Sequence, residues 1–91
     1  MTIAAHFKPQ GMTAETFDLV HKELSDAGAG IPSGRLLHIA FGPSEAIEVI
    51  DVWETMDDFT AFGAKLMPIL ASHGIDPGQP NVQPVDRLIK G

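Results

Sequence analysis

The sequence predicts an α+β fold in which an antiparallel four-stranded sheet carries two helices on one of its faces. Short segments that alternate between apolar and polar residues predict strands, and two longer segments with apolar residues at helical spacing predict helices. Gly and Pro residues separate these segments and predict the turns between them. The 91 residues are enough for one domain, which we expect to span residues 1–91.

The first strand and the first helix are expected in the N-terminal third of the chain. Residues 3–8 alternate between two faces and are followed by Pro9 and Gly11, which do not readily extend a strand. Thr13 is a suitable N-cap for a helix that continues to about Ala27, and Gly28 ends it. The apolar positions of this helix are Phe17, Val20, Leu24 and Ala27.

The second and third strands, residues 35–41 and 45–53, are expected to form a hairpin. The segment 42–44, Gly-Pro-Ser, has turn chemistry and joins them directly. If Phe41 lies opposite Ala46, then His38 lies opposite Val49, and Asp51 lies opposite Leu36. In this register His38 and Asp51 are diagonal neighbours on one face of the sheet.

The C-terminal half predicts a second helix and a last strand. Thr55 is the expected N-cap, and Asp58 follows three residues later, as in a capping box. Pro68 lies inside the helical pattern and is expected to kink or interrupt the helix, which Gly74 ends. The last strand, about residues 82–89, contains Pro84 and therefore suits an edge or a bulge.

This order, β-α-β-β-α-β, is the ferredoxin-like arrangement, with both helices on one face of the sheet. On the third strand, Ile50 and Val52 suit contact with the helices. The opposite face is then uncovered and too apolar for water, so we expect a homodimer whose two open sheet faces enclose a cavity. The expected open face contains Ala4, His6, Leu36, His38, Ala40, Ile47, Val49, Asp51 and Trp53.

Composition excludes several classes of partner and site. The net charge of −6 without a basic cluster makes nucleic acid and anionic membranes improbable partners. The chain has no cysteine, and no HxH or HExxH spacing indicates a metal site. No segment is typical of a signal peptide or a membrane span, so we expect a soluble cytoplasmic protein.

The segment Asp51-Val52-Trp53-Glu54-Thr55, followed by Met56-Asp57-Asp58-Phe59, resembles the dimeric α+β barrel superfamily and its antibiotic-biosynthesis-monooxygenase-like branch. The resemblance in topology covers the whole chain. It implies a dimeric barrel made of two ferredoxin-like sheets. The activities that it implies are varied: cofactor-free monooxygenases, polyketide cyclases, haem-degrading enzymes, isomerases and proteins with no known activity.

The haem-degrading members carry their iron-binding histidine about ten residues after the tryptophan. Gly63 occupies that position here, and the only histidine near the second helix is His73, close to its far end. The resemblance therefore does not imply haem in this chain. We expect neither a cofactor nor a metal.

The candidate catalytic residues are His38 and Asp51. A histidine beside a carboxylate in a partly apolar cavity can act as a general base, with the acid orienting the ring. Such a base could remove a proton from a phenol or a β-dicarbonyl compound. The expected ligand is an aromatic or polyketide-like small molecule, for a cofactor-independent monooxygenase or cyclase. The expected ligand-binding residues are His6, Trp53, Leu36, Ala40 and Val49.

The alternative is a protein without catalysis, either a ligand-binding or a purely structural dimer. In its structural form the polar side chains would bond to each other or to the second copy, and side chains would fill the lumen. A metal-binding triad of His6, His38 and Asp51 is a weaker alternative. His21 is expected to be a partly buried helix residue without a functional role.

Overall fold

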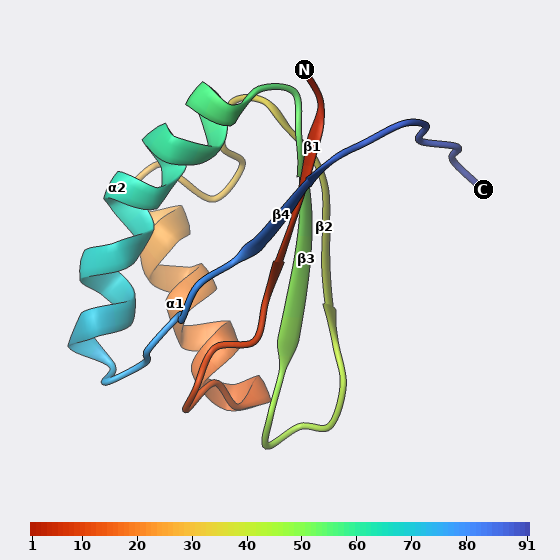
Figure 1. The fold of residues 1–91 in the computed structure, drawn as a ribbon. Helices are drawn as coiled ribbons and strands as arrows, with labels where there is room; N and C mark the ends of the chain where they lie inside the picture. Colours follow the sequence, from red (N-terminus) through yellow and green to blue (C-terminus); the bar gives the residue numbers. More distant parts are fainter.

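The structure, a computed structural model, describes residues 1–91 and contains the six predicted elements in the predicted order. Four antiparallel strands form one sheet in the order β2-β3-β1-β4, and both helices cover one of its faces (Figure 1). The ferredoxin-like α+β prediction is therefore confirmed. The elements are β1 (Ile3–Phe7), α1 (Ala14–Asp26), β2 (Arg35–Phe41), β3 (Glu48–Trp53), α2 (Met56–Ser72) and β4 (Asn81–Pro84).

Both helices begin at the predicted caps. The Thr13 hydroxyl accepts a hydrogen bond from the backbone N–H of Thr16 at 3.1 Å, and the Thr55 hydroxyl accepts one from Asp58 at 3.1 Å. Each bond satisfies a backbone donor that the first helical turn leaves unpaired. The expected interruption at Pro68 is wrong, because α2 continues through it to Ser72. Neither helix combines the length and the hydropathy that a membrane span requires.

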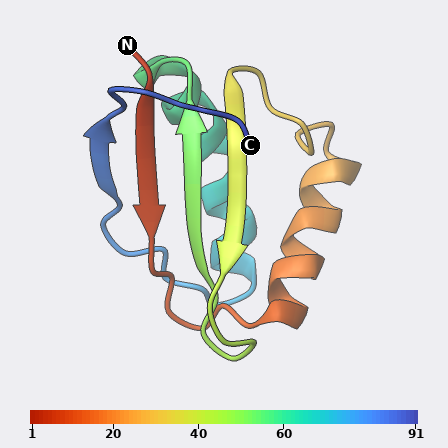
Figure 2. The ribbon, with the colours of Figure 1, turned by 90° about the vertical axis from the view of Figure 1, so that its right-hand side faces the viewer.

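The last strand is shorter than predicted. It ends at Pro84, which has no backbone N–H to donate, whereas the prediction extended it to residue 89. β4 pairs only with β1 and is therefore an edge strand of the sheet, as expected. Residues 85–91 then leave the sheet on the side that carries no helices (Figure 2).

The predicted register between β2 and β3 is wrong by two residues. Phe41 pairs with Glu48 rather than Ala46, because the connection is longer than the three-residue turn that the sequence suggested. His38 therefore lies directly opposite Asp51. A register shift between Arg35 and Leu37 leaves Leu36 unpaired in the ladder.

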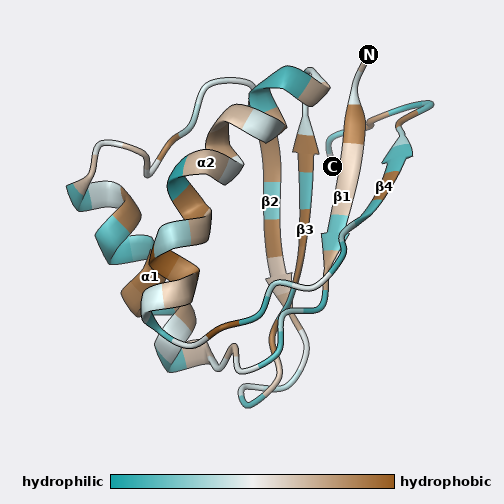
Figure 3. Cartoon of the chain, turned by 60° about the vertical axis from the view of Figure 1, so that its left-hand side comes forward, coloured by the Kyte–Doolittle hydropathy of each residue, from teal (hydrophilic) through white to brown (hydrophobic).

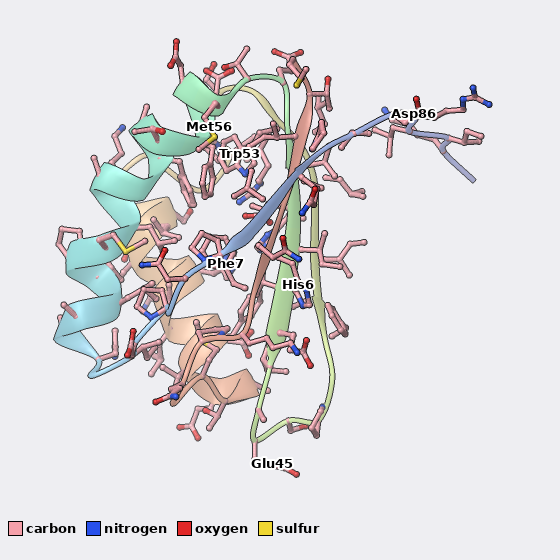
Figure 4. The ribbon with its side chains drawn as sticks, in the orientation of Figure 1. His6, Phe7, Glu45, Trp53, Met56 and Asp86 are labelled. Atoms are coloured by element: carbon pink, nitrogen blue, oxygen red, sulfur yellow. The ribbon has the colours of Figure 1, made fainter.

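The predicted faces of β2 and β3 are also wrong, since they are exchanged. Trp53 pairs with Ile3 and is fully buried against the aromatic rings of α2, with ring centroids 5.2 Å from Phe62 and 6.0 Å from Phe59. The large aromatic side chain therefore decides which face of β3 the helices cover. Figure 4 shows Trp53 and Phe7 between the sheet and the helices, with His6 on the opposite side.

The face of the sheet that the helices leave open is consequently formed, on β2 and β3, by the residues that were expected to contact the helices. On β2 they are Leu37, Ile39 and Phe41, with exposed fractions of 38, 43 and 38%. Both β2 and β3 are largely hydrophobic along their length, whereas β4 is more hydrophilic (Figure 3). The prediction of an uncovered apolar face therefore holds for this single chain, but with a different set of side chains. We refer to Ala4, His6, Leu37, Ile39, Phe41, Glu48, Ile50 and Val52 as the open face.

Candidate functional site

The centre of the candidate site is a pair of residues on neighbouring strands. His38 of β2 and Asp51 of β3 are cross-strand partners, and the His38 Nδ1–H donates a hydrogen bond to the Asp51 carboxylate. Asp51 is the only buried charged side chain of the chain, at 5% exposure. A buried carboxylate is costly without a partner, and His38 supplies one. Because Nδ1 is bonded to Asp51, Nε2 is the ring nitrogen that faces away from the carboxylate.

His21 of α1 extends this pair into a row of three side chains. Its Nε2 lies 3.0 Å from the Nε2 of His38. Phe17, one turn earlier on α1, holds both rings: it lies 4.2 Å from the His21 ring centroid and stacks on His38 at 5.8 Å. Residues four apart share a helix face, so Phe17 and His21 approach the sheet together. The row Asp51–His38–His21 therefore runs from the sheet to the helical layer.

The environment of His21 disfavours its protonated form. Burial lowers the pKa of His21, and the positive charges of His38 and Arg35 lower it further. The two Nε2 atoms face each other and can share only one proton. Asp51 contacts His38 but not His21, so the carboxylate is placed to balance a positive charge on the His38 ring rather than on His21.

A small apolar cavity adjoins this row, between the helices and the sheet. Its volume is about 50 Å³, and most of its lining consists of aliphatic and aromatic side chains. This volume is large enough for a water molecule but lies well below the roughly 300 Å³ of a pocket for a drug-sized ligand. The polar side chains of the lining are His21, His38, Asp51 and Arg35.

Arg35 is the cation of this cavity. It is the first residue of β2, and its guanidinium carbon lies 5.8 Å from the Phe62 ring centroid. Its Nη2 donates to the Gly30 carbonyl at 3.3 Å, and it takes part in none of the ion pairs of the chain. Burial lowers its pKa, an effect that the carboxylate of Asp51 opposes.

The predicted site residues divide between the two faces of the sheet. His38, Asp51 and Val49 line the cavity. Trp53 lies in the core beneath α2, and Leu36 and Ala40 are exposed. On the open face, the His6 Nε2–H donates a hydrogen bond to the Glu48 carboxylate at 2.9 Å. The cavity that the structure contains lies within the single chain, between the helices and the sheet. His6 is separated from His38 and Asp51 by the sheet, so the alternative metal triad does not assemble.

Sequence reasoning missed His21 and Arg35. The spacing of Phe17, Val20, His21 and Leu24 does place His21 at the edge of the apolar stripe, and this is the signal that could have found it. No comparable pattern marks Arg35, because its position depends on how the loop after α1 enters β2.

Comparison with solved structures identifies the fold. The chain is similar to SnoaB, a cofactor-independent oxygenase from Streptomyces nogalater, at 16% identity and a TM-score of 0.63, over 99% of this chain and 96% of the other. The chain has the fold of the antibiotic biosynthesis monooxygenases. This confirms, for the fold, the resemblance seen in the sequence.

Two further structures agree. A protein named as an antibiotic biosynthesis monooxygenase from Deinococcus radiodurans matches at 10% identity and a TM-score of 0.62, over 99% of this chain and 97% of the other. A protein of the same description from Caulobacter crescentus matches at 19% identity and a TM-score of 0.57, over 97% of this chain and 89% of the other. No protein-family model matches the sequence, and no curated protein matches it either.

Proposed function

We propose that this protein is a cofactor-independent monooxygenase that acts on an acidic aromatic or polyketide-like molecule. His38 is the general base, and Asp51 orients its ring and stabilises its protonated form. The observation that carries the proposal is the hydrogen-bonded row Asp51–His38–His21 at the wall of an apolar cavity. The fold of a cofactor-independent oxygenase supports it by analogy, since fold alone does not determine function.

The chemistry begins with a proton transfer. A phenol or an enolisable carbonyl compound in the cavity loses a proton, which comes to rest on His38 beside Asp51. The resulting conjugated anion is electron-rich and can reduce O₂ without a cofactor. In the overall reaction a CH₂ group of the substrate and O₂ give C=O and H₂O. One oxygen atom stays in the product, and the other leaves as water with both hydrogens.

The volume of the cavity places a condition on this function. A ring-containing substrate needs more room than about 50 Å³, so binding requires side chains to change rotamer or α1 to move away from the sheet. We therefore expect ligand binding to change the rate of hydrogen exchange at the backbone amides of α1.

The test of the proposed function is oxygen uptake with a panel of anthrones, naphthols and β-diketones. The wild-type protein is expected to oxidise at least one compound, and His38→Gln is expected to lose that activity while keeping its circular dichroism spectrum. His73→Gln is the matched control, because His73 pairs with Glu23 at 2.6 Å outside the cavity. Full turnover by His38→Gln would show that His38 is not the base.

The same proposal includes a homodimer formed through the open face. Leu37, Ile39 and Phe41 form an exposed row on β2, and monomeric proteins rarely leave such a row in water. Leu88 and Ile89 of the C-terminal segment, 39 and 78% exposed, leave the sheet on the same side and add apolar surface (Figure 2). A two-fold partner would cover the face with an identical surface.

One observation favours the second candidate function, a dimer without catalysis. The cavity is small enough to be a packing defect filled by water, and in that case the row of histidines only satisfies the buried Asp51. Failure of every compound of the panel to bind or react, together with a stable dimer, would favour this candidate over the monooxygenase.

A further inference from the structure

We propose that Arg35 is the anion-binding residue of the cavity, so that the molecule bound there is a planar conjugated acid held as its oxyanion. The inference rests on the proposed function in taking this cavity as the binding site. It goes beyond that function by assigning a specificity residue and by stating the charge and shape of the bound molecule.

The first argument is the unused donor capacity of Arg35. A guanidinium carries five N–H donors, and this one donates a single hydrogen bond, to the Gly30 carbonyl at 3.3 Å. The ion pairs of the chain are His6–Glu48, His38–Asp51 and His73–Glu23, and none includes Arg35. Asp51 is near enough to influence Arg35, but it is already bonded to His38.

The second argument is the environment of the guanidinium. Arg35 is half-buried, lines the apolar cavity and lies against the Phe62 ring. A cation in such surroundings loses hydrogen bonds to water. An oxyanion with two acceptor sites in one plane replaces those hydrogen bonds. The fork of the guanidinium and the adjacent ring both favour a flat ligand.

A second donor without a hydrogen-bond partner lies beside Arg35. The indole N–H of Trp53 is buried and has no hydrogen-bond partner. Trp53 is the cross-strand neighbour of Arg35, and both side chains pack on Phe62. Trp53 is fully buried and does not line the cavity, so Arg35 is the donor of this corner that a molecule in the cavity can contact.

The charges of the site agree with this assignment. With both histidines neutral, the lining carries one positive charge, on Arg35, and one negative charge, on Asp51. When a bound acid gives its proton to His38, the total charge is unchanged, and each charge gains an opposite partner. Asp51 pairs with protonated His38, and Arg35 pairs with the oxyanion. The transfer thus creates a second ion pair in an apolar environment, where such a pair is strong.

The test compares two ligands that differ in charge but little in shape. 2-Hydroxy-1,4-naphthoquinone is an enolate at pH 7, and 2-methoxy-1,4-naphthoquinone is neutral. We expect calorimetry to show at least tenfold tighter binding of the enolate by the wild-type protein. In Arg35→Met we expect this preference to disappear, with the affinity for the methyl ether retained. Arg35→Lys is expected to keep part of the preference, because it keeps the charge but loses the fork.

Controls separate the possible failures. Arg87→Met removes a cation from the exposed C-terminal segment and is expected to bind both compounds like the wild type. Equal binding of the two compounds by the wild type, or an undiminished preference in Arg35→Met, would overturn the assignment of Arg35 and leave the proposed function standing. Binding of neither compound by the wild type would instead contradict the cavity as a binding site, and the proposed function with it.

Discussion

The two faces of the sheet each carry a histidine–carboxylate pair, and the pairs differ in their surroundings. His6 and Glu48, on the open face, are both 31% exposed and lie 2.9 Å apart. The side chains of His38 and Asp51, under the helices, are 22 and 7% exposed, and His21 and Arg35 lie close by. Solvent screens the first pair, so it contributes little. The second is held in an apolar environment, where a proton transfer has large consequences. Burial, rather than residue type, makes one pair a candidate for chemistry.

Substituting the carboxylate of each pair tests the difference between the two faces most directly. Asp51→Asn is expected to lower turnover by about 10² to 10⁴-fold, because the His38 ring loses its orienting acceptor and the partner of its positive charge. Glu48→Gln, the same change on the open face, is expected to leave turnover within about twofold, the effect expected for a screened pair. The measurement is kcat/KM for both variants on the substrate found by oxygen uptake. Equal losses in the two variants would remove the distinction between the faces.

We expect the open face, unlike the covered face, to form the dimer interface. Ile39→Glu places a charge at the centre of the row on β2 and is expected to weaken dimerisation by about 2 kcal/mol or more, since interface centres contain the energetic hot spots. The measurement is molar mass by light scattering over a range of concentrations. Ile31→Glu, at a 95% exposed position in the loop after α1, is the control. A dimer unaffected by Ile39→Glu would place the interface elsewhere.

The covered face is also expected to make stability depend on pH. The pKa of His21 is lowered by burial, so the unfolded chain binds more protons than the folded one just below pH 6.5. His21 therefore lowers stability as the pH falls below 6.5, and its effect is absent above that value. Denaturant unfolding from pH 8 to pH 5 is expected to show a smaller loss in His21→Gln than in the wild type. His73→Gln serves as the comparison, and identical profiles for wild type and His21→Gln would contradict the expectation.

The smallest effect is expected for the exposed pair itself. A double-mutant cycle with His6→Ala and Glu48→Ala is expected to give a coupling of about 0.2–1 kcal/mol, the range of solvent-exposed ion pairs. Urea unfolding at pH 6 measures all four proteins of the cycle. A coupling well above that range would show that the open face is shielded from solvent, as a tight dimer interface would shield it.

The sequence was sufficient to predict the order of elements, because the helix caps at Thr13 and Thr55 and the alternating strands are local signals. It also indicated that His38 and Asp51 share a face, since the side chains of strands alternate. It could not decide which face the helices cover. Both faces of β2 and β3 are apolar, so alternation gives two sets of residues without assigning either to the core.

The remaining parts of the site depend on tertiary structure. The register between His38 and Asp51 follows from the length of the loop after Phe41, and Gly and Pro there suggested too short a turn. His21 joins the site only because α1 packs over β2, and Arg35 only because the preceding loop returns to Phe62. Contacts between distant segments of this kind leave no periodic pattern in the chain.

The most direct test of the central claim, that the site lies beneath the helices of each chain, is NMR of the histidine rings. The chain has four histidines, so their ring signals can be assigned individually by substitution. On addition of 2-hydroxy-1,4-naphthoquinone, we predict that the signals of His21 and His38 shift while those of His6 and His73 do not. Shifts at His6 without shifts at His38 would place the ligand on the open face, between two sheets, and would contradict the account.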